Sequence, residues 1–295
     1  MQCIYKFNVT HKVNFNIIIE QFNFSGKIII GLFAIVLVLL ILNFSFKMIE
    51  MGYVMKFKRP FYTHFYISLR KLEPKYKSIL AQKFLFYKNL EPKYERYFEH
   101  RVASFIKDKE FIGREGITVS DEMKTLISAT AVMLTFGFRD FYIGLIDKIF
   151  IYPNSFYSTS NDEYHKGEFN PRLQTLVLSW SDFLKGFEIG DDNINLGIHE
   201  FAHAVHLNSL KERDVSSIIF SDSFKELTTL LSHNETLRNE LIASKYFRDY
   251  AYTNQYEFLA VIIESFLETP QEFKSQFPEV YQKTKQMLNF NFIGY

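Results

Sequence analysis

Residues 193–210 read NINLGIHEFAHAVHLNSL and contain the pattern His-Glu-x-x-His at His199, Glu200 and His203. Positions i and i+4 lie on one face of a helix, so both imidazoles can reach one ion at about 2.0–2.1 Å, the usual zinc–nitrogen distance. Apolar residues interleave with the motif and give such a helix a side to bury. The pattern therefore favours a metal-binding helix over a surface helix with solvated histidines.

Two neighbours of the motif need an interpretation. His206 lies three residues beyond His203, which moves it about 4.5 Å along a helix axis, so we interpret it as a polar neighbour and not as a ligand. Asp191 or Asp192 can cap the start of the helix, because an Asp side chain accepts hydrogen bonds from the first free N–H groups.

A hydrolytic zinc site needs three protein ligands and one open position for water. The only cysteine is Cys3, and the chain after the motif reads AVHLNSL, so the extended His-x-x-Gly-x-x-His continuation is absent. The third ligand should then be a carboxylate from another helix. The stretch 250–268, YAYTNQYEFLAVIIESFLE, offers Glu257, Glu264 and Glu268. Glu257 and Glu264 share a helical face, but spacing alone also fits a helix with solvated glutamates.

Composition bounds the class of protein. The chain has 295 residues, of which 47% are hydrophobic and 23% charged, which is typical of a globular protein. A formal net charge of +1 provides no basic field for nucleic acid. One cysteine excludes an intrachain disulfide and fits a reducing compartment.

An uncharged apolar run occupies residues 28–46, IIIGLFAIVLVLLILNFSF. Its 19 residues span about 28 Å as a helix, close to the ~30 Å hydrocarbon core of a bilayer. A cleaved signal peptide and a buried core helix are the alternatives, but 27 residues precede the run and no Ala-x-Ala cleavage site follows it. We expect one transmembrane helix.

Flanking charges predict its orientation. Of Lys and Arg, residues 13–27 contain only Lys27, whereas residues 47–61 contain Lys47, Lys56, Lys58 and Arg59. Positive charge favours the cytoplasmic side, so the C-terminal part should lie in the cytoplasm. The predicted organisation is an N-terminal segment 1–27, a transmembrane helix 28–46 and one domain over 60–295, because no linker divides the last.

The remaining sequence predicts an α+β fold that is mainly helical with a small sheet. The pentapeptide LEPKY at 72–76 and 90–94 places a proline in the first turn of two helices, and 119–138 is typical of a buried helix that Ser120 or Asp121 caps and Gly137 ends. Residues 208–249 are also helical in pattern, and 257–288 predicts a helix ending before Pro270 and another after Pro278.

Two short stretches rich in β-branched and aromatic residues, 147–153 and 175–180, predict strands. The polar sequence between them, 154–171, predicts a loop or hairpin in which His165 is an ordinary solvent-exposed residue. Strand 175–180 could pair with an extended peptide by edge addition.

Four stretches in order resemble the Mlc titration factor A (MtfA) family of zinc peptidases. They are FIGREGITVSDEMKTLISATAVMLTFGF, LVLSWSDFLKG, NINLGIHEFAHAVHL and YAYTNQYEFLAVIIESFLETPQEF, within a similarity that runs from about residue 76 to 290. The core is also similar to that of lethal-factor-type peptidases, which share the spacing of Tyr250 and Glu257. The resemblance implies a zincin-like metallopeptidase domain.

The resemblance also implies one zinc ion and a role for each matching residue. It makes His199, His203 and Glu257 the zinc ligands, Glu200 the general base, Tyr250 the group facing the developing oxyanion, and Glu264 a supporting group behind the ligands. Many relatives carry Asp where this chain has His206, so a local contact differs. From the residues alone, Tyr250 fits a packed aromatic equally well, as one of 18 tyrosines.

These observations predict a zinc-dependent peptidase held in the cell membrane by a single span, with a cytoplasmic catalytic domain and a peptide or protein substrate. An alternative is a regulatory binding protein on a peptidase scaffold that sequesters a protein partner, such as a transcriptional regulator. A structural membrane protein is a third class. Retention of Glu200 favours catalysis, because a binder has no need of a general base.

Overall fold

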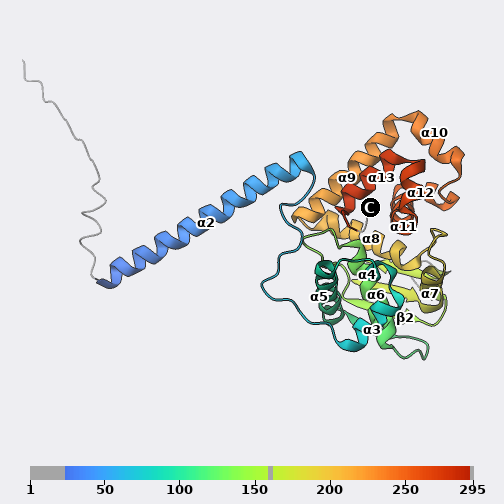
Figure 1. Cartoon of the computed structure of the whole chain (residues 1–295), viewed down its shortest axis with the longest axis horizontal. Helices are drawn as coiled ribbons and strands as arrows, with labels where there is room; N and C mark the ends of the chain where they lie inside the picture. Colours follow the sequence, from blue (N-terminus) through green and yellow to red (C-terminus); the bar gives the residue numbers. More distant parts are fainter. Residues whose placement is uncertain (1–23, 159–161, 293–295) are drawn as a thin grey trace, which may run out of the picture. The chain divides into compact units, whose positions relative to one another are not determined.

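The computed structural model describes residues 24–158 and 162–292. The chain divides into two units between Gly52 and Tyr53. Most of the predicted segment 1–27 therefore lies outside the described residues. Figure 1 gives the order of the elements along the chain.

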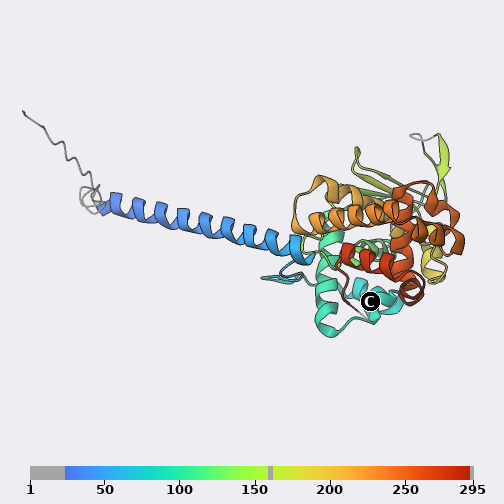
Figure 2. The same cartoon turned by 90° about the horizontal axis from the view of Figure 1, so that it is seen from above.

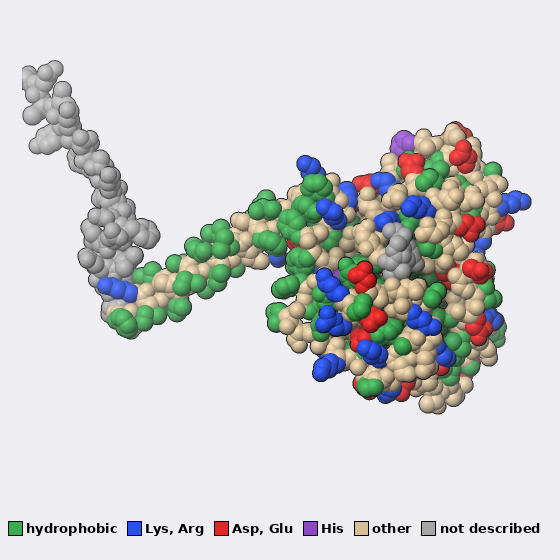
Figure 3. Space-filling model, viewed as in Figure 1, with side chains coloured by type: hydrophobic (Ala, Val, Ile, Leu, Met, Phe, Trp, Pro, Cys, Tyr) green, Lys and Arg blue, Asp and Glu red, His purple; other side chains and the backbone are tan. Residues whose placement is uncertain are grey.

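Helix α2, Phe24–Phe57, contains the predicted apolar run and extends beyond it at both ends. Its 34 residues include an 18-residue window of mean hydropathy 2.9, with none of that window buried. Apolar side chains are spread around the helix and follow its length (Figure 3). By length and composition, this helix could cross a membrane.

The larger sheet has four strands, in the order β1 (Glu110–Gly113), β2 (Lys148–Tyr152), β6 (Thr175–Ser179) and β5 (Gly167–Asn170). β1, β2 and β6 are parallel, and β5 pairs antiparallel with β6. The two predicted strands are present as β2 and β6. The expectation of edge pairing at 175–180 is wrong, because β6 lies between β2 and β5 and both of its sides are already paired.

The predicted loop or hairpin between those strands contains a hairpin of its own. β3, Phe156–Ser158, pairs antiparallel with β4, Glu163–His165, and this pair stands out from the body of the unit (Figure 2). β5 follows after one residue and returns the chain to the larger sheet. The hairpin and the edge strand β5 are therefore adjacent in sequence.

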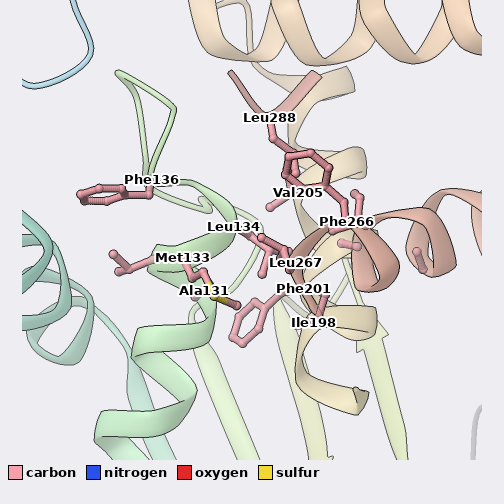
Figure 4. Packing of buried hydrophobic residues seen from close by; sticks show 14 of the residues in the cluster. Ala131, Met133, Leu134, Phe136, Ile198, Phe201, Val205, Phe266, Leu267 and Leu288 are labelled. Atoms are coloured by element: carbon pink, nitrogen blue, oxygen red, sulfur yellow. The ribbon is translucent and has the colours of Figure 1, made fainter. Parts of the chain in front are cut away.

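The core lies where α6 (Asp121–Leu134), α8 (Leu196–Lys211) and α11 (Gln255–Glu268) pack together. Figure 4 shows Leu134, Phe201 and Leu267 meeting at the centre of this packing. Phe201 and Leu134 have no exposed surface, and Leu267 has 8%. Burial of such side chains is worth roughly 1.5–3 kcal/mol each, so this contact fixes α8 against α11.

Proline and capping residues set most of the helix starts. Both LEPKY copies begin a helix with proline in the first turn, as predicted, and Pro270 and Pro278 each begin a helix as well. The remaining helices are α3 (Pro74–Lys83), α4 (Leu85–Lys88), α5 (Pro92–Asp108), α7 (Trp180–Glu188), α9 (Val215–His233), α10 (Glu235–Ser244), the 3₁₀ helix η1 (Asp249–Tyr252), α12 (Pro270–Gln276) and α13 (Pro278–Leu288).

Two predicted helix ends are wrong. α8 is capped by Asn195, whose side chain accepts from the Ile198 N–H at 3.1 Å, whereas Asp192 accepts from Ile194 in the preceding turn. Asp191 and Asp192 lie too early in the chain to cap α8.

Helix α6 is capped by Ser120, as expected, but it ends at Leu134 and not at Gly137. Gly137 instead allows close packing, since a Cβ there would lie 2.2 Å from the carbonyl oxygen of Leu288. The fold class is confirmed as α+β, mainly helical with a small sheet.

Candidate metal centre

Helix α8 presents His199 and His203 one turn apart on one face. Their Nε2 atoms lie 3.2 Å apart. His199 is buried and His203 is half-buried. Two N–H groups cannot point at each other at this distance, so the pair suits a shared proton acceptor or a cation between them.

Helix α11 brings Glu257 to the same point. Its Oε2 lies 3.0 Å from Nε2 of His199 and 3.6 Å from Nε2 of His203. This oxygen is buried and makes no hydrogen bond of normal geometry within the described part of the chain. Ligands placed tetrahedrally around zinc at 2.0–2.1 Å lie about 3.3–3.4 Å from one another, close to the observed separations. These three side chains could therefore hold a metal ion.

Glu264, two turns further along α11, lies behind His199. Its Oε1 is 2.6 Å from Nδ1 of His199, and its Oε2 accepts from the backbone N–H of Asn195 at 2.9 Å. The side chain has no exposed surface. A carboxylate at Nδ1 fixes that nitrogen as the N–H donor and leaves the Nε2 lone pair free for a metal.

Arg248 balances the buried charge of Glu264. Its guanidinium donates to both carboxylate oxygens, at 2.8 and 2.9 Å, and also to the carbonyl of Asn193. Such a two-bond pair fixes the plane of the carboxylate as well as neutralising it. Arg248 precedes η1, outside any periodic helix pattern, and the sequence did not single it out.

The ligand-type groups shift each other's pKa. Burial alone lowers the pKa of His199, but the contacts with Glu257 and Glu264 outweigh it and raise the pKa to about 9. Burial likewise raises the pKa of Glu257, yet the imidazoles of His199 and His203 hold it well below its usual range. A histidine must lose its Nε2 proton to bind a metal, so metal binding here should release protons.

Glu200 follows His199 in the same turn of α8 and is buried, with 8% of its surface exposed. Burial raises the pKa of this carboxyl, while the positive charge of His199 and His203 opposes the rise. Strand β5 passes close to it at Gly167, where a Cβ would lie 2.6 Å from Cγ and Oε1 of Glu200. Glycine at position 167 therefore leaves the space that the Glu200 side chain fills.

Tyr250, on η1, places its ring centroid 6.0 Å from that of His199. The side chain is half exposed. Burial, followed by the negative charge of Glu257, raises the pKa of Tyr250 to about 12. The hydroxyl is thus protonated at neutral pH and able to donate a hydrogen bond.

A cavity of about 500 Å³ opens beside these groups. Its volume is within the usual range of about 300–1,000 Å³ for ligand sites. Residues from the hairpin, the start of β5, α8 and η1 line it. Among the lining residues are His165, Gly167, His199, Glu200, Arg248 and Tyr250.

His165 is not the ordinary solvent-exposed residue that the sequence suggested. It is half-buried at the end of β4, and its Nε2 is buried without a hydrogen-bond partner in the described part of the chain. It lines the same cavity as Glu200, and its charge when protonated lowers the pKa of Glu200. The hairpin brings it there, a long-range placement that the local sequence pattern does not show.

Comparison with known families agrees with this geometry. The model of the family described as glucose-regulated metallo-peptidase M90 matches residues 60–289. The chain belongs to this family. Membership in the M90 family confirms the resemblance to the MtfA peptidases and implies a metallopeptidase with a metal cofactor and peptide or protein substrates.

A relative of the M90 chain occurs in the cyanobacterium Synechocystis sp. (strain ATCC 27184 / PCC 6803 / Kazusa). The uncharacterized protein slr2042 is 27% identical over 235 residues, which cover 72% of this chain and 82% of the relative. The sequence similarity to this distant homologue therefore covers most of both chains.

Two further polar residues, His206 and Glu268, lie near the candidate metal site but are not among the residues that could hold the ion. His206 packs against the rings of Phe224 and Tyr256, its ring nitrogens have no hydrogen-bond partner in the described residues, and burial lowers its pKa to about 4. Glu268 accepts from the Asn195 side chain at 3.0 Å, and burial raises its pKa to about 7. Neither belongs to the group of three that could hold a metal.

Proposed function

We propose that this chain is a zinc-dependent peptidase anchored in the cell membrane by α2. In this proposal His199, His203 and Glu257 hold one zinc ion, Glu200 is the general base, Tyr250 faces the oxyanion and Glu264 orients His199. The observation that carries the proposal is the convergence of two imidazole nitrogens and one buried, otherwise unpartnered carboxylate oxygen within 3.6 Å of one another.

The ligand types favour zinc. Two imidazoles and one carboxylate form a set that catalytic zinc sites use, with a fourth position left open for water or substrate. The Oε2 of Glu257 supports this choice, because it is buried, makes no hydrogen bond of normal geometry among the described residues and faces two imidazole nitrogens, an arrangement that a cation between the three atoms would stabilise.

The side chains around the centre divide the chemistry of peptide hydrolysis. Zinc, when bound, supplies Lewis-acid polarisation and makes water acidic enough to deprotonate near neutral pH. Glu200 takes a proton from the attacking water and passes it to the leaving amine nitrogen, and its raised pKa suits both steps. The Tyr250 hydroxyl donates a hydrogen bond to the oxygen on which negative charge develops.

The buried position of Glu200 supports catalysis over partner binding alone. A regulatory binder on this scaffold would need the cavity but not a carboxylate buried at its wall, which costs free energy to desolvate. An extended substrate would pair with β5, the terminal strand of the larger sheet, which carries Gly167 beside the cavity.

The location of the activity is the second part of the proposal. We propose that α2 spans the membrane once and that residues 60–295 form the peptidase domain in the cytoplasm. The apolar window of α2 and the excess of Lys and Arg after the run support this arrangement. Residues 1–27 would then lie on the opposite side.

The test compares the full chain in detergent with its Glu200→Gln variant, using zinc content and cleavage of a fluorogenic peptide library. The variant should keep stoichiometric zinc and lose cleavage by about 10²–10⁴-fold, the usual contribution of a general base. Glu212→Gln, which changes an exposed carboxylate at the other end of α8, should leave both unchanged. Equal cleavage by wild type and Glu200→Gln would refute the assignment of the base.

A further inference from the structure

The last turns of α2 and the chain that leads from there to α3 combine basic and apolar side chains, and the nearest acids are Glu50 and Glu73 at either end. Residues 51–72 read MGYVMKFKRPFYTHFYISLRKL, without Asp or Glu and with five basic residues. Of these, Arg59, Arg70 and Lys71 are exposed and lie within residues 59–71, which we name the connecting segment.

The connecting segment displays large apolar side chains to solvent. Ile67 is 97% exposed and Phe65 is 73% exposed, and Phe61, Tyr62 and Leu69 are exposed to lesser degrees. Single exposed apolar residues are common, but a cluster of five in nine positions marks a surface that contacts something apolar.

The backbone of the connecting segment is held in place by contacts with α5 and with Phe136. The fully buried Arg101 donates to the carbonyl of Thr63 at 3.3 Å and to the hydroxyl of Tyr66 at 2.6 Å. His64 packs its ring against those of Tyr97 and Phe136, with centroids 4.9 and 4.7 Å apart. These contacts hold the backbone against α5. His64 and Tyr66 are half-buried, whereas Phe65 and Ile67 between and beside them are exposed.

We propose that the connecting segment docks on an anionic lipid surface. Phe65 and Ile67 enter the interfacial layer, and Arg59, Arg70 and Lys71 bind lipid phosphates or carboxylates. This inference rests on the proposed anchoring by α2, which ends at Phe57, two residues before the segment begins. The apolar run ends at Phe46, so the 11 further residues of α2, about 16 Å of helix, join the bilayer-spanning part to the segment and keep it near the surface that α2 enters.

Charge decides between a lipid surface and other occupants. Anionic headgroups complement a segment whose only charged side chains are Arg59 at its start and Arg70 and Lys71 at its end, and each Lys or Arg near such a surface strengthens binding by roughly five-fold. A second copy of the chain would bring the same basic residues against each other, and like charges across an interface oppose association.

The test measures depth in the membrane by fluorescence quenching. Because Cys3 is the only cysteine, Cys3→Ser permits a single label in the full chain, reconstituted into nanodiscs with or without phosphatidylserine. A label at Ile67→Cys should be quenched by a nitroxide near the lipid headgroup, and more strongly with phosphatidylserine. A label at Ile242→Cys, on the exposed surface of α10, is the matched control and should stay bright.

Charge reversal completes the test. Arg70→Glu combined with Lys71→Glu should raise the phosphatidylserine fraction needed for half-maximal quenching at position 67. Equal quenching at positions 67 and 242 would overturn the docking proposal. So would a label at position 67 that is shielded from aqueous iodide but not quenched by lipid, because a protein surface would then cover it.

A third label separates docking from anchoring. Val38→Cys lies in the middle of the apolar run and should be quenched by a nitroxide at the bilayer centre. Quenching at 38 with none at 67 would reject docking and keep the anchor. Quenching at 67 with none at 38 would reject the anchor and keep the lipid contact.

Discussion

Oε1 of Glu264 lies 2.6 Å from Nδ1 of His199, while Oε2 of Glu257 lies 3.0 Å from Nε2 of the same ring. The two carboxylates are seven residues apart on α11, and each contacts a different nitrogen of the His199 imidazole. Arg248 pairs with Glu264 and makes no contact of this kind with Glu257 among the described groups. Glu264 is thus placed to orient the imidazole ring of His199, whereas Glu257 is placed where it could hold a metal ion.

Tyr250→Phe should fold and keep its metal but lose turnover. The phenol hydroxyl is protonated at neutral pH, and removing one oxyanion donor typically costs about 10²–10³-fold in kcat. Tyr256→Phe is the control, because Tyr256 is also partly exposed but packs against His206. Steady-state cleavage of one fluorogenic peptide measures both variants, and an unchanged kcat for Tyr250→Phe would reduce it to a packing residue.

Gly167→Ala should impair catalysis without removing the metal. The new Cβ would lie 2.6 Å from Cγ and Oε1 of Glu200, so the carboxylate must move. A displacement of about 1 Å in a catalytic group can cost roughly 10²-fold in rate. Gly144→Ala, where the nearest atom is 3.7 Å from the added Cβ, should be nearly neutral. If Gly167→Ala cleaves as fast as wild type, the close contact does not hold Glu200 in place.

Acid should destabilise the fold through His64. Burial, followed by the positive charge of Arg101 and Lys93, lowers the pKa of His64 from 6.5 to about 2. Because the folded pKa lies below the unfolded one, the stability contributed by neutral His64 is present above pH 6.5 and is lost as the pH falls towards 2. The loss approaches about 1.4 kcal/mol per pH unit for one proton.

His64→Phe keeps a ring in the aromatic cluster and should remove this part of the acid sensitivity. His233→Phe changes an exposed histidine on α9 and should leave the sensitivity as in wild type. Urea unfolding between pH 5 and 7.5, followed by the fluorescence of Trp180, measures the difference. Parallel pH dependence in wild type and His64→Phe would show that His64 is not the titrating group.

Local periodicity made part of the site predictable from the sequence. His199 and His203 are one helical turn apart, and Glu257 and Glu264 are two turns apart, so their sharing of faces follows from helix geometry. The mainly helical class and the strands β2 and β6 follow from similarly local patterns.

The parts that depend on long-range placement were not predictable. The central position of β6 depends on β5 pairing with it, and His165 reaches the cavity because of the hairpin that precedes β5. Arg248 lies outside any periodic element, and its role depends on Glu264 being buried beside it. Asn195 caps α8, because the Asp192 side chain accepts a hydrogen bond from the Ile194 N–H in the turn before the helix.

The most direct test of the proposed metal centre is a zinc titration of the folded full chain and three variants. Glu257→Ala should abolish stoichiometric zinc, because only two histidine ligands remain. Glu264→Gln should still load at excess metal, with affinity reduced about 10–100-fold by the loss of a group that orients a ligand. His206→Ala, the control, should bind as wild type does. Stoichiometric zinc in Glu257→Ala together with its loss in Glu264→Gln would contradict the account.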